Sequence, residues 1–258
     1  MTCKIGGQRS SFNISRKVRW ILMVILVVSL LLGVSAQQPR AATNAQFGFQ
    51  TQSSTAQDQV RIAAERKTEE GNALMAQGTA ESLRLAVKKY EESLLLWRSI
   101  GDHSGEAAVL HGIGTIHYVL GEMRKALDNL NQALSLMRTS GDRSSEAYTL
   151  DIIGKVHASI GEKQKALGYY NQSLSLWRAA GISARVAETL NNIGGVYFDL
   201  GEKRKALDFF NETLLLSRAV GDHRVEALAL GSIGAVYHVV MRLMCSSILP
   251  TWHALLVA

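Results

Sequence analysis

Cysteine and histidine are the residues of this chain whose side chains could support catalysis. The two cysteines are Cys3 and Cys245, and Cys245 lies close to His253 near the carboxyl end. A cysteine nucleophile and its histidine base must be held within hydrogen-bond distance by a fold of their own. The apolar stretch that follows His238 is too short to provide such a fold. We therefore predict no catalytic residues and no enzyme activity.

Two other histidines, His117 and His157, lie forty residues apart, and Tyr197 and Tyr237 occupy the same position farther along. A position that accepts either histidine or tyrosine is typical of a packed side chain with a polar tip. A metal site needs several ligands at fixed spacing, and the chain has no such cysteine or histidine pattern. The sequence predicts no metal and no cofactor.

The charge of the chain is concentrated at its amino end. The formal net charge is +6, but five Lys and Arg residues and no acidic residue lie among the first 36 positions. Removing that segment leaves a net charge of +1. A nearly neutral remainder lacks the basic surface that nucleic-acid binding requires, so we predict no nucleic-acid partner.

The amino-terminal segment has the pattern of a secretory signal. The apolar run WILMVILVVSLLLGV, residues 20–34, follows the basic residues and precedes Val34 and Ala36 at a small-x-small site. This pattern predicts a signal peptide over 1–36, cleaved before Gln37, and export to the periplasm or medium. The alternative is an uncleaved anchor in the inner membrane formed by residues 20–34, although that run is short for a span.

Residues 37–58 are rich in Gln, Ala, Ser and Thr and show no periodicity. Such composition is typical of a flexible linker.

From about Gln59 the chain is a repeat with a period of forty. The segment GEKQKALGYYNQSLSLWRAAG, residues 161–181, matches the segments forty residues earlier and later at twelve of twenty-one positions each. Periods of 20–50 residues indicate stacked supersecondary units. In each unit, apolar residues at helical spacing fall into two stretches separated by a glycine such as Gly121, which predicts a hairpin of two helices. At the junction to the next unit, Gly141 suits a left-handed helix end and Asp142 suits a helix cap.

Small residues recur inside both helices. Glycine in a helix interior costs up to ~1 kcal/mol relative to alanine, so its recurrence predicts a close helix–helix approach. We expect the alanines of the partner helix to oppose these glycines, with larger apolar side chains beyond them. The repeat positions are Gly114, Ala126, Gly154, Ala166, Tyr170, Gly194, Ala206, Phe210 and Gly234.

These positions resemble the tetratricopeptide repeat. The fourth unit carries the family's pattern at Leu190, Ile193, Gly194, Tyr197, Gly201, Ala206 and Phe210. The resemblance implies an all-α fold, a right-handed α-solenoid of helix hairpins. The family's usual period is 34 residues, and the longer form looks like bacterial repeats often joined to a caspase-like peptidase domain, which is absent here. Arg138, Arg178 and Arg218 replace the helix-ending proline, so we expect both helices to run longer.

The expected organisation is a solenoid over 59–240 with units at about 59–100, 101–140, 141–180 and 181–220 and a half-unit at 221–240. The repeat stops near Val239, and an apolar tail follows over 241–258. Three interpretations of the tail remain open: a divergent helix that folds back as a cap, a membrane-associated segment, or a disrupted reading frame of a longer protein. A solenoid normally ends in a polar capping element.

The resemblance implies a protein- or peptide-binding scaffold whose ligand lies on the concave face formed by the first helices. Two alternatives remain: a regulatory part of a truncated multidomain cysteine peptidase, and a structural module that self-associates through its uncapped carboxyl end. Asparagine can pair with a ligand's backbone, and aromatic residues can bury its side chains. The candidate groove residues are His111, Thr115, Tyr118, Tyr148, Asp151, Lys155, Asn191, Asn192, Phe198 and Asp199.

Overall fold

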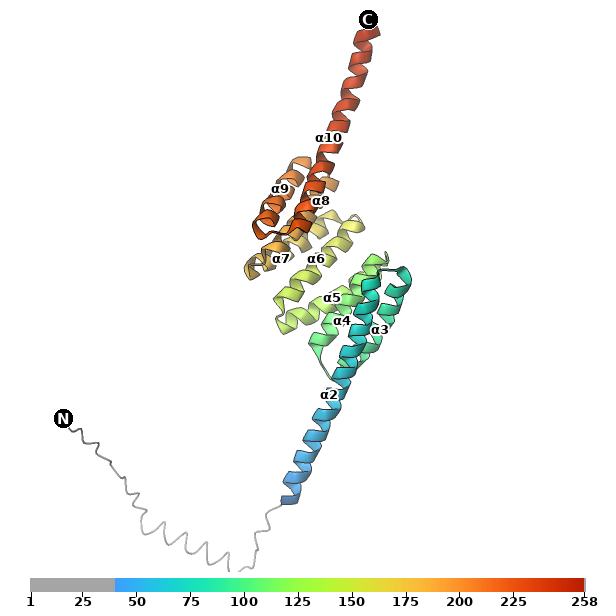
Figure 1. Cartoon of the computed structure of the whole chain (residues 1–258), viewed down its shortest axis with the longest axis vertical. Coiled ribbons are helices and arrows are strands. Elements are labelled where there is room, and N and C mark those ends of the chain that lie inside the picture. Colours follow the sequence, from blue (N-terminus) through green and yellow to red (C-terminus); the bar gives the residue numbers. More distant parts are fainter. Residues whose placement is uncertain (1–39, 258) are drawn as a thin grey trace, which may run out of the picture. The chain divides into compact units, whose positions relative to one another are not determined.

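The computed structural model describes the backbone of residues 40–257 and the side chains of residues 55–244. The chain divides into two compact units, residues 1–54 and 55–258. The predicted signal peptide, 1–36, lies outside the described residues. Residues 40–257 form nine helices and no strand (Figure 1). The helices are α2 (Arg40–Gln77), α3 (Ala80–Ser99), α4 (His103–Val119), α5 (Met123–Ser140), α6 (Arg143–Ser159), α7 (Lys163–Ala180), α8 (Ser183–Asp199), α9 (Lys203–Val220) and α10 (His223–Val257).

The segment predicted as a flexible linker differs from the prediction. Helix α2 begins at Arg40, so residues 40–58 are helical. Their Gln, Ala and Arg residues have high helix propensity, and the segment contains no proline after Pro39. The composition of the segment, and not apolar periodicity, is what favours its helix.

The predicted helix hairpins are confirmed from α4 onward, as α4 packs on α5, α6 on α7 and α8 on α9. The junctions have the predicted chemistry: Gly141 adopts a left-handed φ of 75°, and the Asp142 carboxylate accepts a hydrogen bond from the amide of Ser145. Ile182 replaces the aspartate at the next junction and provides no side-chain cap. The helix α8 thus lacks a stabilising contact that α4 and α6 have.

The close approach at the repeated glycines is confirmed, but its partner differs from the expected one. A methyl group at Gly154 would lie 2.6 Å from the Tyr170 ring, and one at Gly194 would lie 2.6 Å from the Phe210 ring. Gly114 faces Leu130 in the same way. The alanines are buried nearby, but the large side chain four residues later fills the space that the glycine leaves.

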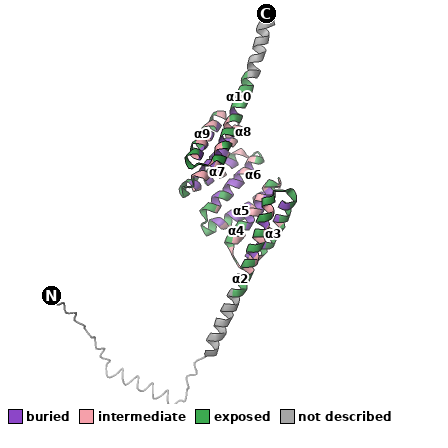
Figure 2. Cartoon of the chain, viewed as in Figure 1, coloured by how far each residue is buried: buried purple, intermediate pink, exposed green. Residues whose placement is uncertain are grey.

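The core runs along the stack of hairpins (Figure 2). Adjacent first helices approach one another, α4 with α6 and α6 with α8, and each first helix also packs on the second helix of the preceding unit. The first helices therefore line the shorter, inner side of the stack. In the second unit, the apolar residues at helical spacing on both helices are buried, except Leu127, which is half-buried. The buried members are Ala107, Leu110, Ile113, Gly114, His117, Ala126, Leu130, Ala133, Leu134 and Met137.

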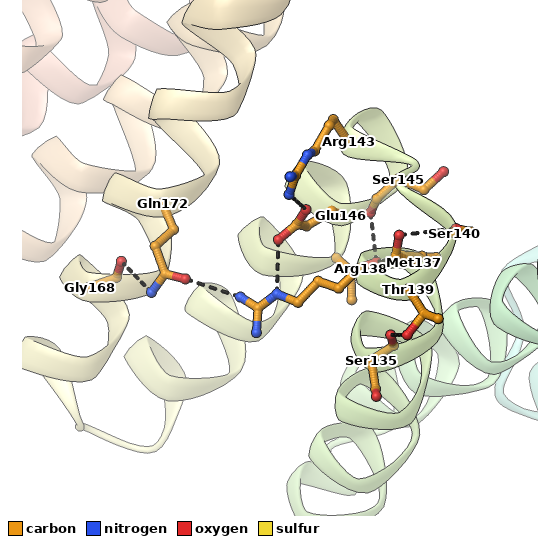
Figure 3. Close-up of polar contacts among 11 residues, drawn as sticks. Ser135, Met137, Arg138, Thr139, Ser140, Arg143, Ser145, Glu146, Gly168 and Gln172 are labelled. Atoms are coloured by element: carbon orange, nitrogen blue, oxygen red, sulfur yellow. Dashed lines mark hydrogen bonds and ion pairs between the residues drawn. The ribbon is translucent and has the colours of Figure 1, made fainter.

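An arginine near the end of one hairpin binds a glutamate at the start of the next. Arg138 Nε donates to Glu146 Oε1 at 2.9 Å, and Arg143 contacts the other oxygen of Glu146 at 2.8 Å (Figure 3). Arg98–Glu106 and Arg218–Glu226 repeat the contact at 2.7 Å. We call this contact the Arg–Glu clasp. It explains why arginine stands where the family usually has a helix-ending proline.

The clasp around Glu146 is the most buried one, since the Glu146 side chain is only 6% exposed. Burial alone would raise the pKa of Glu146, but hydrogen bonds from Arg138 and Arg143 outweigh it, and the net pKa is lowered. The next junction has Val186 at the glutamate position, and Arg178 instead contacts Glu212 at 3.1 Å. One junction of the stack therefore lacks both the clasp and the aspartate cap.

Helix α10 departs from the hairpin pattern. It runs from His223 to Val257 without the glycine turn that ends the other first helices (Figure 1). The tail therefore continues the helix, and no capping helix folds back within the described backbone. Residues His223–Met244 are long and apolar enough to cross a membrane by length and composition. Only 11% of that stretch is buried, and Leu230, Tyr237 and Met241 are exposed within it.

Candidate functional site

The groove residues expected from the sequence lie on three consecutive first helices, α4, α6 and α8, on the inner side of the stack. They surround three hollows in the described surface. Each hollow spans at least two helices, so the stacking of hairpins creates it and no single repeat contains it. Of the three, the first hollow has the largest volume, and its rings, Tyr148 and Trp177, contact each other.

The first hollow has a volume of about 430 Å³. The first helices contribute His111 and Tyr148, and the second helices contribute Met137 and Trp177. Arg185 lies at its rim, at the start of α8. We call this hollow the aromatic pocket. Its remaining lining residues are Ala108, Ser144, Ser145 and Ile182.

Tyr148 organises the aromatic pocket. Its ring meets the rings of His111 and Trp177 edge-on, with centroids 5.9 and 6.2 Å away. The Arg185 guanidinium covers the Tyr148 ring at 4.5 Å. Edge-to-face pairs and cation–π contacts hold such side chains in fixed orientations. Tyr148 is nevertheless 39% exposed, so its ring remains accessible to a ligand.

His111 contributes a neutral ring to the pocket. Burial lowers its pKa to about 4, because the charged form loses hydration. Its Nδ1 lies 2.9 Å from the Thr149 hydroxyl, which itself donates to the Ser145 carbonyl. This arrangement fits the tautomer with the proton on Nδ1. The Thr115 hydroxyl lies 3.5 Å from Nε2, so two predicted groove residues contact each other.

The charge at the rim comes from Arg185 and Glu188. An Arg185 terminal nitrogen donates to Glu188 Oε2 at 2.7 Å, and the other Glu188 oxygen contacts Arg224 from α10. A guanidinium has five N–H donors, so Arg185 can hold Glu188 and still bind a second acceptor. The pocket therefore combines an apolar aromatic interior with a cation at its edge.

Asp151 forms a buried polar cluster between α6 and α8. It accepts hydrogen bonds from Thr189 at 3.3 Å and Asn192 at 3.1 Å, and Lys155 lies 3.4 Å away. Burial raises the pKa of Asp151, although these three partners partly oppose the effect. The cluster fixes the spacing of the two helices. A small hollow of about 80 Å³ lies beside it, toward Tyr148.

The third hollow, about 310 Å³, lies between α8 and α10 and includes Asn191, Asn192, Phe198 and Asp199. The asparagines expected to face a ligand line this hollow, and each also contacts a neighbouring hairpin. Asn192 donates to Asp151, and Asn191 accepts from Ser232 at 3.3 Å. Asp199 binds Lys163 at 2.5 Å. Both asparagines thus hold adjacent hairpins together, and Tyr118 is half-buried against the core beside Leu130.

Several pocket residues escaped the sequence analysis. Trp177, Met137 and Ile182 lie on second helices or at a junction, whereas only first-helix positions were considered. Arg185 and Glu188 stand where the repeat has no recurring residue. The sequence did carry a signal for these residues, namely a departure from the repeat. Ile182 and Arg185 both fall in the unit that begins with Gly181-Ile182, where the units at 101, 141 and 221 begin with Gly-Asp.

The repeated histidines have a structural role. His157 Nδ1 lies 2.6 Å from Glu162, which begins the next helix, and its ring stacks on Tyr169. His117 Nδ1 lies 2.9 Å from Glu122 but is less well aligned for a hydrogen bond. Among the described side chains, no group of three or more His, Cys, Asp or Glu residues could hold a metal ion.

Comparison with known families decides the classification. Models described as tetratricopeptide repeat match residues 69–139 and 107–179, and a further tetratricopeptide model matches 186–221. Together these matches cover more than half of the chain. The chain belongs to the tetratricopeptide repeat family. No curated protein sequence matches it significantly.

Solved structures agree with the tetratricopeptide fold. Aspartyl phosphate phosphatase F from Bacillus subtilis is 13% identical with a TM-score of 0.65, and the match covers 90% of this chain and 59% of that one. A signal-transduction ATPase with a tetratricopeptide repeat sensor from Pyrococcus horikoshii is 20% identical, with a TM-score of 0.61 over 67% of this chain. This chain spans only 27% of the archaeal protein.

A Rap protein complexed with competence and sporulation factor is also similar, at 16% identity and a TM-score of 0.60. The match covers 68% of this chain and 48% of that one. At these identities the likeness concerns the fold. The repeats and the similar folds support a protein-interaction scaffold.

Proposed function

We propose that the protein is a non-catalytic scaffold that binds a protein segment on the inner side of its solenoid, with one ligand side chain in the aromatic pocket. The observation that carries the proposal is the pocket itself, formed around Tyr148 from five consecutive helices. A volume of about 430 Å³ lies within the range of small-ligand sites and accommodates a large side chain. The similar Rap protein is named as a complex with competence and sporulation factor, which adds support by analogy.

The lining predicts the chemistry of the ligand. Tyr148, Trp177 and Met137 favour an aromatic or branched apolar side chain, since such groups bury large areas against rings. Because His111 is neutral above its pKa of about 4, it offers no competing charge. Arg185 at the rim favours a carboxylate beside that side chain. The expected motif is an apolar residue next to Asp or Glu.

We also propose that the scaffold works outside the cytoplasm, in the periplasm or medium. The support is the basic amino end followed by the apolar run of residues 20–34 and a small-x-small site at Val34 and Ala36. Export would be tested by amino-terminal sequencing of protein recovered outside the cytoplasm. A first residue of Gln37 is expected, whereas an intact amino end in the membrane fraction would favour the anchored form.

The peptide-binding proposal can be tested with a displayed library of random twelve-residue peptides. Enriched peptides should carry an apolar residue beside an acidic one, and Tyr148→Ala should weaken their binding at least tenfold. Arg185→Gln should weaken acidic peptides more than matched amide peptides. Leu215→Ala is the control, because Leu215 is 70% exposed on the second helix α9. Equal binding by wild type and Tyr148→Ala would contradict the proposed site.

A further inference from the structure

The apolar face of α10 is the same face that a second helix covers in the preceding units. Leu110, Leu150 and Leu190 hold equivalent positions forty residues apart, and their exposed fractions are 2%, 0% and 0%. Leu230 holds the next equivalent position and is 46% exposed. The difference follows from α10 continuing straight, where the other first helices turn back into a second helix.

The empty space has a defined shape. A methyl group at Gly114, Gly154 or Gly194 would collide with a side chain of the second helix, whereas one at Gly234 would have nothing within 4 Å. The sequence thus retains at Gly234 the residue that permits a close helix approach, and no described residue makes that approach. A helix running antiparallel to α10 would fill the space as in the other hairpins.

Residues of α10 that share this face follow from about 100° of rotation per residue. Their size changes along the helix: the amino-terminal half has mostly small residues, and the carboxyl-terminal half has large ones. The face consists of Ala227, Leu230, Gly231, Gly234, Tyr237, His238 and Met241. Its opposite side, with Val225, Ala229 and Val236, is fully buried in the stack.

We propose that this face binds the α10 helix of a second copy of the chain, related by a twofold axis near Gly234. A twofold axis at that point makes the two helices antiparallel, which is the orientation of the second helix in every complete hairpin. It also pairs the halves of unlike size, placing Met241 against Ala227 and Tyr237 against Gly231. Such a self-complementary face is what an isologous interface requires.

The pairing also buries the exposed apolar side chains. Tyr237, 56% exposed, would pack on Gly231 of the other copy, Leu230 would pack on His238, and Met241, 63% exposed, would enter the same seam. Arg242 lies at the edge of the seam, where its long side chain can extend into water. The stack of each copy packs on the opposite side of α10, where Val225 and Val236 are buried, which leaves the proposed face open to a second helix.

The full chain with Cys3→Ser and Cys245→Ser provides the background for cross-linking. Gly234→Cys in this background should form a disulfide-linked dimer under mild oxidation, because the two residues meet at the axis. Leu228→Cys is the matched control, since Leu228 is also 46% exposed but lies about 120° around the helix. It should form no disulfide-linked dimer under the same conditions.

Leu230→Glu and Leu228→Glu then distinguish specific pairing through this face from nonspecific hydrophobic association. The native molecular mass by light scattering should be twice the chain mass of 28.2 kDa in the wild type and in Leu228→Glu. Leu230→Glu should restore the monomer and abolish the Gly234→Cys cross-link, with an unchanged circular dichroism spectrum. Association that survives Leu230→Glu would overturn the proposal, because it would come from another segment such as residues 20–34.

A monomeric wild type would overturn it as well. Flotation with phosphatidylcholine vesicles distinguishes the cause: a monomer that floats through α10, and loses flotation on Leu230→Glu, would assign this face to lipid. A monomer that neither floats nor cross-links would leave the face without a second copy and equally refute the pairing.

Discussion

Gly194 leaves the space in which the Phe210 ring lies: a methyl group at residue 194 would lie 2.6 Å from Phe210 Cε1. The two residues come from opposite helices of one hairpin, and Phe210 is almost fully buried. This contact recurs between Gly154 and Tyr170. It shows that the repeat preserves a glycine because of the ring it accommodates.

We expect Gly194→Ala to lower the free energy of unfolding by ~1–3 kcal/mol, because the buried ring must move or the helices must separate. Gly195 is the matched control. A methyl group there meets nothing within 4 Å, so Gly195→Ala should raise stability by up to ~1 kcal/mol through helix propensity. Urea unfolding measures both, and effects of the same sign would contradict the close-packing role.

Ile182→Asp should stabilise the protein. Asp142 caps α6 through the Ser145 amide, and Ile182 stands at the equivalent position before α8 without such a contact. Restoring the cap should raise the free energy of unfolding by ~1 kcal/mol, while Asp142→Ile should lower it by a similar amount. Thermal unfolding of the two variants provides the comparison, and a loss of stability in Ile182→Asp would show that the apolar contacts of Ile182 matter more.

The clasp should be strongest where it is most buried. Removing Glu146, Arg138 or both in a double-mutant cycle should give a coupling energy of ~1–3 kcal/mol, since Glu146 is buried and hydrogen-bonded to charged groups. The same cycle at Arg218 and Glu226 should give a smaller coupling, because the Glu226 side chain is 23% exposed. Equal couplings would indicate that burial does not determine the strength of the clasp.

The stability of the protein should fall between pH 6.5 and pH 4 because of His111. Its folded-state pKa of about 4 lies below the ordinary value of 6.5, so in this window the unfolded chain binds a proton that the folded chain does not. The loss should reach about 2–3 kcal/mol by pH 4.5. The raised pKa of Asp151 acts in the opposite direction, favouring the folded state as the pH falls.

Comparison with His111→Gln isolates the histidine, because Asp151 is present in both proteins. The variant should lose less stability than the wild type on acidification, as measured by urea midpoints at pH 7.5, 5.5 and 4.5. Parallel curves for the two proteins would mean that His111 is readily protonated in the fold.

The helix hairpins could be predicted from the sequence because the same residue types recur every forty positions. A hairpin of two helices accounts for these residues in each copy of the repeat. The left-handed Gly141, the cap at Asp142 and the close approach at Gly194 are confirmed in this way. The opposing residue was assigned wrongly, since spacing alone does not show that Phe210 reaches back over Ala206. The helical segment after Arg40 was missed because it has no apolar stripe.

The candidate site was less predictable. Tyr148 and His111 were identified, as groove positions follow from the repeat. Trp177 and Arg185 were not, because they reach the pocket from a second helix and from a junction that breaks the pattern. Asn192 lines a hollow, but its donation to Asp151 is a contact between hairpins that no single repeat can reveal.

The junction between α7 and α8 lacks two contacts that the other junctions of the stack have. Arg178 has no clasp with a glutamate there and Ile182 provides no cap, whereas the junctions at Arg98, Arg138 and Arg218 have both. Hydrogen exchange should be faster for the amides of residues 178–186 than for 138–146. The aromatic pocket spans this same junction, so a ligand side chain bound there would contact both of the hairpins that the junction joins.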